Sequence, residues 1–94
     1  MQITTADSIR VKDILLSFGI KRAGMFGSQA RHDTHATSDL DLLVEFQDVA
    51  SLFDMIRLKH TLEDELHIVV DLVEYNAIKP ILRNNILSEE IRLI

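Results

Sequence analysis

The chain has 94 residues, no cysteine and a formal net charge of −5. The length predicts a single domain, residues 1–94, with a thin hydrophobic core. The lack of cysteine excludes disulfides, thiolate metal sites and cysteine nucleophiles. The acidic charge disfavours stable binding of long nucleic acid, because that affinity comes largely from neutralising phosphates.

No apolar run approaches the roughly 20 residues that a membrane-spanning helix needs. Residues 1–10 also lack the apolar core of a signal peptide. We therefore expect a cytoplasmic protein with no membrane partner. The acidic surface suits a basic protein partner, and a single nucleotide accompanied by Mg²⁺ is compatible with it.

The first half of the sequence predicts a helix, two strands and a helical turn. Apolar residues at helical spacing indicate a helix over residues 6–18. Residues 21–26 are typical of a short strand, residues 28–31 of a helical turn, and residues 32–37 of a polar loop. Residues 39–46 alternate between an apolar face and a face that begins with two carboxylates, which indicates a strand.

The second half predicts a further helix, strand and helix. Residues 51–66 form the clearest helix, with one broad apolar side that favours a core position. Residues 67–74 contain a β-branched run typical of a buried strand, and residues 78–87 predict a last helix. Residues 88–94 are either another helical turn or a short closing strand. This order predicts an α/β (α+β) fold, a small mixed sheet of three or more strands with helices mainly on one face.

Asp39 and Asp41 are the first candidates for chemistry. Residues two apart on a strand point to the same face, so both carboxylates should project from one edge of the sheet. Adjacent carboxylates repel each other unless cations neutralise them. Mg²⁺ prefers such hard oxygen ligands, and two ions can clamp the attacking and leaving oxygens of a phosphoryl displacement.

Gly27, Ser28 and Arg31 are candidates for phosphate binding. Glycine lets the main chain approach a phosphate closely, and N–H groups with a hydroxyl at the start of a helical turn can hold anionic oxygens. Arg31 lies one turn further on and could reach the same phosphates. Asp71 is the best candidate for a third metal ligand, because a charge within an apolar strand needs a partner or a metal.

Residues 25–31 (MFGSQAR), followed by residues 38–44 (SDLDLLV), resemble the DNA polymerase β-like nucleotidyltransferase superfamily. Within it, the chain looks most like the minimal nucleotidyltransferases, and the resemblance covers essentially its whole length. Many relatives have glycine after the arginine, where this chain has His32. The resemblance implies the polymerase β-like core as the fold.

The resemblance also implies roles for individual residues. Gly27 and Ser28 would bind nucleotide, and Asp39 and Asp41 would bind metal. Asp71 would bind metal and help to activate the acceptor hydroxyl. All three aspartates are thus expected to be catalytic, with two Mg²⁺ ions as cofactors and ATP as the substrate.

Many minimal nucleotidyltransferases resemble antitoxins encoded beside a HEPN-type RNase toxin, and some transfer AMP from ATP to a toxin tyrosine. The resemblance therefore implies a protein adenylyltransferase that acts as an antitoxin in a complex with a cognate HEPN-type toxin. A binding module that neutralises its partner by contact alone is the alternative. Transfer to a small molecule or nucleic acid ranks lower, because the chain lacks the extra domains that larger relatives use for such acceptors.

Each candidate residue also has a structural interpretation. Asp39 and Asp41 taken alone could be solvated residues at a strand start, and Asp71 could be an edge-strand carboxylate paired with Arg or Lys. Ser28 could cap the turn after the glycine, and Arg31 could form a surface salt bridge. The one tyrosine could accept a nucleotide itself, although a packed position at a strand end is favoured.

Overall fold

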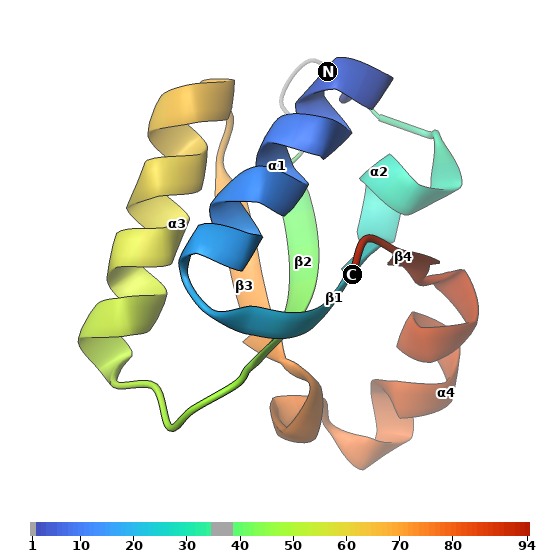
Figure 1. Ribbon diagram of the computed structural model, residues 1–94. Coiled ribbons are helices and arrows are strands. Elements are labelled where there is room, and N and C mark those ends of the chain that lie inside the picture. Colours follow the sequence, from blue (N-terminus) through green and yellow to red (C-terminus); the bar gives the residue numbers. More distant parts are fainter. Residues whose placement is uncertain (1, 35–38) are drawn as a thin grey trace.

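The computed structural model describes residues 2–34 and 39–94, so the predicted loop at residues 32–37 lies partly outside the described residues. Helices and strands follow one another in the predicted order (Figure 1). The elements are α1 (Thr5–Ser17), β1 (Ile20–Phe26), α2 (Gly27–Arg31), β2 (Leu40–Phe46), α3 (Leu52–Leu66), β3 (Val70–Glu74), the 3₁₀ helix η1 (Tyr75–Ala77), α4 (Pro80–Glu89) and β4 (Ile91–Arg92).

The sheet has the strand order β3-β2-β1-β4. Strands β2 and β3 are parallel and are joined by α3, whereas β1 is antiparallel to both of its neighbours. The predicted mixed sheet is therefore confirmed. The ambiguous segment at residues 88–94 takes both predicted forms, because α4 continues to Glu89 and the two-residue strand β4 follows it.

Helices α1 and α3 begin in the same way. Thr4 and Ser51 each accept a hydrogen bond from the main-chain N–H three residues later, and the side chains of Asp7 and Asp54 accept one in return. Such capping boxes satisfy N–H groups that the first helical turn leaves unpaired. After α1 the chain turns at Gly19, whose φ of +76° favours glycine.

Helices α1 and α3 lie side by side over one face of the sheet (Figure 1). The alternate residues of β2 that face them are buried, as the strand pattern predicts. On the other face, Leu43 is buried against η1 and against Ile86 and Leu87 of α4. The fully buried side chains of the larger core are Val11, Leu15, Ile20, Ala23, Leu40, Leu42, Val44, Leu58, Leu62 and Val70.

Two predictions about burial are wrong in part. The apolar side of α3 is buried only from Leu58 onward, because Leu52 is 75% exposed and Ile56 is 39% exposed. Strand β3 is shorter than predicted and lies at the edge of the sheet rather than in its interior. Among the described residues, no helix has both the length and the apolar character needed to cross a bilayer.

Candidate active site

The sheet topology brings the predicted residues to one end of the sheet. Strand β1 ends at Phe26, whereas β2 and β3 run the opposite way and begin at Leu40 and Val70. The register pairs Asp41 with Phe26 on one side and with Asp71 on the other. Directly paired residues of neighbouring strands project to the same face. Asp41 and Asp71 therefore lie together, next to the turn that follows β1.

The electrostatics of Asp41 reflect this crowding. Burial, the charges of Asp71 and Asp39, and a hydrogen bond with Asp71 together raise the pKa of Asp41 to about 6. The charge of Arg31 opposes this shift, so the guanidinium acts on the same carboxylate. Asp39, Asp71 and Arg31 thus all act on the charge of Asp41. Their roles in binding and catalysis stay predictions.

Gly27 is required by the position of Asp41. Its φ is +72°, in the left-handed region that favours glycine. A Cβ atom on Gly27 would lie 2.3 Å from Oδ2 and 3.2 Å from Cγ of Asp41. Because Gly27 has no side chain, the Asp41 carboxylate can occupy this position. The sequence predicted only a phosphate-binding role for Gly27.

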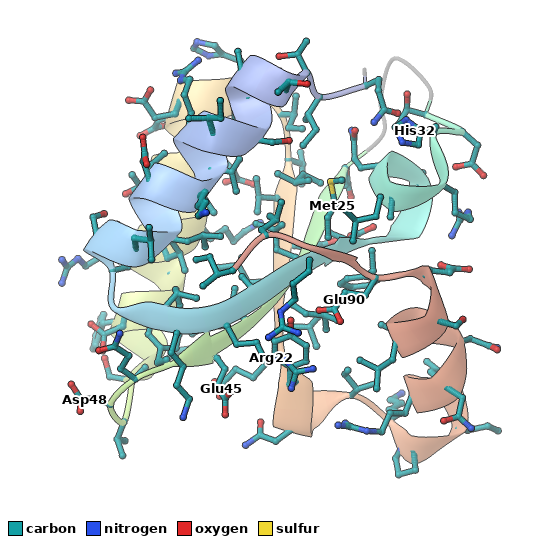
Figure 2. All side chains as sticks on the ribbon, turned by 45° about the vertical axis from the view of Figure 1, so that its right-hand side comes forward. Arg22, Met25, His32, Glu45, Asp48 and Glu90 are labelled. Atoms are coloured by element: carbon teal, nitrogen blue, oxygen red, sulfur yellow. The ribbon has the colours of Figure 1, made fainter. Side chains whose placement is uncertain are left out.

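Ser28 lies inside the first turn of α2 and does not cap it. The N-cap residue is Phe26, which makes no side-chain capping bond, so the capping interpretation of Ser28 is wrong. At the other end of α2, His32 adopts a left-handed conformation with φ of +59°. Glycine has no steric penalty there. His32 marks this end of the molecule in Figure 2, opposite Asp48 in the turn after β2.

Arg31 forms the surface ion pairs that were one of its two predicted roles. Its Nε lies 3.1 Å from Oδ2 of Asp33, and its Nη1 lies 3.1 Å from Oε2 of Glu89. Glu89 belongs to α4, and no feature of the sequence pointed to it, because 58 positions separate it from Arg31. The ion pairs hold the guanidinium beside the carboxylate cluster.

Asp71 is exposed rather than buried in an apolar strand. The argument that desolvation requires a partner for it was therefore wrong, because β3 is an edge strand. The edge-strand alternative fits the position but not the pairing: in the part of the chain that the structure describes, Asp71 has no ion pair with Arg or Lys. The charged group that interacts with Asp71 is the carboxyl group of Asp41.

The carboxylate cluster suits a divalent cation in its chemistry. Hard oxygen donors and mutual repulsion are the properties that Mg²⁺ sites use. Over residues 2–34 and 39–94, however, no three His, Asp or Glu side chains lie close enough together to hold a metal ion as they stand. The metal-binding roles of Asp39, Asp41 and Asp71 accordingly stay predictions.

Tyr75 is packed, as the structural interpretation favoured. The guanidinium of Arg22 lies over the Tyr75 ring, with the Cζ atom of Arg22 4.0 Å from the ring centroid. The Tyr75 hydroxyl donates a hydrogen bond to the carboxylate of Glu90. Figure 2 shows Arg22 and Glu90 close together beside β1. Burial and this hydrogen bond raise the pKa of Tyr75. Tyr75 is only 5% exposed and its hydroxyl is already hydrogen-bonded, so it is a poor acceptor for a nucleotide.

The sequence matches the family described as polymerase β, nucleotidyltransferase, over residues 10–94. It is 46% identical over 85 residues to a candidate protein adenylyltransferase of Methanocaldococcus jannaschii, which covers 90% of this chain and 91% of that protein. The protein adenylyltransferase MntA of Thermococcus cleftensis is 36% identical over 78 residues, which are 83% of this chain and 79% of that protein.

Solved structures share the fold. A candidate minimal nucleotidyltransferase superposes with a TM-score of 0.81 at 40% identity, over 92% of this chain and 88% of that chain. A chain in the complex of a tri-AMPylated Shewanella oneidensis HEPN toxin with an MNT antitoxin gives a TM-score of 0.77 at 18% identity, over 98% of this chain and 72% of that chain. The second likeness shows the fold alone. By its sequence and its fold, the chain belongs to the polymerase β family of nucleotidyltransferases.

Proposed function

We propose that residues 1–94 are a minimal domain that moves AMP from ATP to a protein hydroxyl and acts as an antitoxin. The proposed acceptor is a tyrosine of a cognate HEPN-type toxin. The observation that carries the proposal is the pairing of Asp41 with Asp71 beside Gly27 at one end of the sheet. The names of the relatives, two of them protein adenylyltransferases, support the type of reaction.

The nucleotide is proposed to bind at the turn between β1 and α2. The first main-chain N–H groups of a helix have no partner inside the helix and can bind an anion. Gly27 and Ser28 would contact the phosphates there. Arg31 would also contact the phosphates after giving up its ion pairs with Asp33 and Glu89. Phosphate oxygens, like carboxylate oxygens, accept two parallel hydrogen bonds from a guanidinium group.

Asp39, Asp41 and Asp71 would hold Mg²⁺, with two ions proposed. Bound Mg²⁺ supplies positive charge that neutralises the triphosphate and the leaving pyrophosphate. The repulsion that raises the pKa of Asp41 is relieved by such a cation. Because the three side chains do not converge as they stand, we expect at least one of them to change rotamer when the metal–nucleotide complex binds.

The proposed reaction is an in-line displacement at the α-phosphorus. The acceptor hydroxyl oxygen forms a bond to the α-phosphorus as the bond to the bridging oxygen of pyrophosphate breaks. Asp71 is the most exposed of the three carboxylates, so it faces the side from which an acceptor can approach. It would take up the hydroxyl proton, and catalysis would come mainly from positioning and charge neutralisation.

Intact mass spectrometry tests the proposal. A HEPN-type toxin encoded beside the protein is incubated with the chain, ATP and Mg²⁺, and its mass is followed with time. We expect a gain of one or more AMP units with the native chain and with Asp48→Asn, an exposed aspartate at the far end of the molecule (Figure 2). The Asp39→Asn/Asp41→Asn variant should give no gain.

The same samples separate the two forms of antitoxin action. If the toxin is silenced by the native chain while its mass stays constant, the proposal fails and the chain acts by contact alone. Silencing by the double variant as strong as that by the native chain would lead to the same conclusion. The Asp48→Asn variant shows whether loss of a negative charge elsewhere has any effect.

A further inference from the structure

An ion pair joins the proposed phosphate-binding turn to the last helix. Arg31 is the last residue of α2, and its Nη1 lies 3.1 Å from Oε2 of Glu89, the last residue of α4. Helices α2 and α4 contact each other and lie on the same side of the molecule (Figure 1). The side chain of Glu89 therefore reaches a group that the nucleotide is proposed to contact, although 58 positions separate it from Arg31.

Arg31 is bound by two carboxylates at once. Its Nε donates to Asp33 and its Nη1 donates to Glu89. The hydrogen bond to Asp33, and then that to Glu89, raise the pKa of Arg31 above its usual value. Phosphate oxygens bind the same guanidinium donors as carboxylate oxygens do. Arg31 therefore cannot present these N–H groups to ATP while both carboxylates remain bound.

The position of Glu89 is set by contacts other than the ion pair. Leu87 packs against the cluster that contains Leu43 and Tyr75, and the carboxylate of Glu90 accepts a hydrogen bond from Tyr75. The side chain of Glu89 itself is 36% exposed. Rotation of that side chain into solvent is therefore enough to release Arg31, and α4 can stay in place.

A carboxylate at the end of α4 does not favour the helix. The C-terminal end of a helix carries a partial negative charge, which favours Lys or Arg in the last turn and disfavours Glu. The last turn of α4, residues 86–89, has the sequence ILSE. An exposed ion pair also adds little to stability. The effect of Glu89 on Arg31 is thus a better account of its place than helix stability is.

We propose that Glu89 competes with the phosphates of ATP for Arg31 and so lowers the affinity of the chain for ATP. This inference rests on the proposed function, and it adds a residue of α4 that controls nucleotide binding from outside the β1–α2 turn and the carboxylate cluster. When ATP binds, the phosphates replace the carboxylate and Glu89 turns into solvent. Because part of the binding free energy is used to break the ion pair, removal of the Glu89 side chain should tighten ATP binding.

The test measures the dissociation constant of ATP with Mg²⁺ by isothermal titration calorimetry, without toxin. It compares the native chain with Glu89→Ala, Arg31→Gln and the double variant Arg31→Gln/Glu89→Ala. Glu65→Ala is the matched control, because Glu65 forms an ion pair of the same type and of comparable exposure with Arg10, between α1 and α3. Urea denaturation checks that each variant is folded.

We expect Glu89→Ala to bind ATP about two- to five-fold more tightly than the native chain, which is the range that one exposed ion pair provides. Glu65→Ala should bind like the native chain. In the Arg31→Gln background, removal of Glu89 should change the affinity little, because the competition requires the guanidinium. In the mass assay with toxin, Glu89→Ala should lower the KM for ATP and leave kcat near the native value.

Other results overturn the inference. If Glu89→Ala binds ATP as the native chain does, or more weakly, Glu89 does not compete for Arg31 and the proposed function stands. An equal gain in affinity with and without Arg31, or in Glu65→Ala, means that loss of negative charge alone is responsible. If the native chain does not bind ATP, the proposed function and this inference both fail.

Discussion

Replacing Asp41 by asparagine should make the protein more stable, although it removes a residue of the candidate active site. In the native chain, burial and the neighbouring carboxylates favour the protonated form of Asp41 and raise its pKa from 3.8 to about 6. The folded state therefore binds a proton more tightly than the unfolded state does. Stability is fully present below about pH 4 and falls as the pH rises through 6, because Asp41 must then carry its charge.

The size of the effect follows from the pKa shift. One pKa unit corresponds to about 1.36 kcal/mol, so a rise from 3.8 to about 6 sets an upper limit of about 3 kcal/mol. Solvent screens part of the repulsion because the side chain is only partly buried. We expect Asp41→Asn to raise the free energy of unfolding at pH 7.5 by about 1–2 kcal/mol and the Tm by roughly 4–16 °C.

Urea denaturation at pH 4.0, 5.0, 6.0 and 7.5 measures this difference. The native chain and the Asp48→Asn control should lose stability between pH 4 and 6 relative to Asp41→Asn, and the gap should vanish at pH 4. Mg²⁺ with ATP should narrow the gap at pH 7.5 by stabilising the native chain alone. A variant that is less stable than the native chain at pH 7.5, or a gap that does not change with pH, would refute the reasoning.

Three other substitutions test the surroundings of the site. Gly27→Ala should lower the free energy of unfolding by about 1–3 kcal/mol and abolish AMP transfer, since its Cβ would collide with Asp41 at a positive φ; urea denaturation and the mass assay check both. Tyr75→Phe should cost about 1–2 kcal/mol through loss of the bond to Glu90, while AMP transfer stays at the native rate. Gln29→Ala should cost about 1–3 kcal/mol in the same denaturation assay, because a buried main-chain N–H near the N-terminus loses its acceptor.

The order of the elements and most of their bounds could be predicted from the sequence. Helices α1 and α3 carry apolar residues at helical spacing and begin at polar caps such as Ser51, and β2 has an apolar residue at every second position from Leu40 to Phe46. These signals are local, because each depends on residues within one or two turns or on neighbouring positions of one strand. For the same reason the spacing of Asp39 and Asp41 at the start of β2 could be interpreted directly.

Predictions that depend on neighbouring elements were less successful. Apolar spacing shows which side of α3 faces inward, but not that the sheet ends before it covers Leu52 and Ile56. Strand order is likewise absent from local patterns, so a β-branched run around Asp71 looked like a buried strand rather than an edge. The ion pair of Arg31 with Glu89 depends on how α4 packs near α2, which no local pattern records.

The cluster of carboxylates is difficult to explain as a structural feature. The parallel pairing of β2 with β3 sets Asp41 opposite Asp71, and Gly27 lacks the Cβ atom that would displace the carboxylate. Both arrangements bring like charges together in a domain whose total stability is about 5–15 kcal/mol. A cost of about 1–2 kcal/mol is then a substantial fraction, and among the described residues the charge of Arg31 opposes the shift without cancelling it. A cation bound with the nucleotide would offset the remainder, so stability and nucleotide binding should be coupled through Asp41.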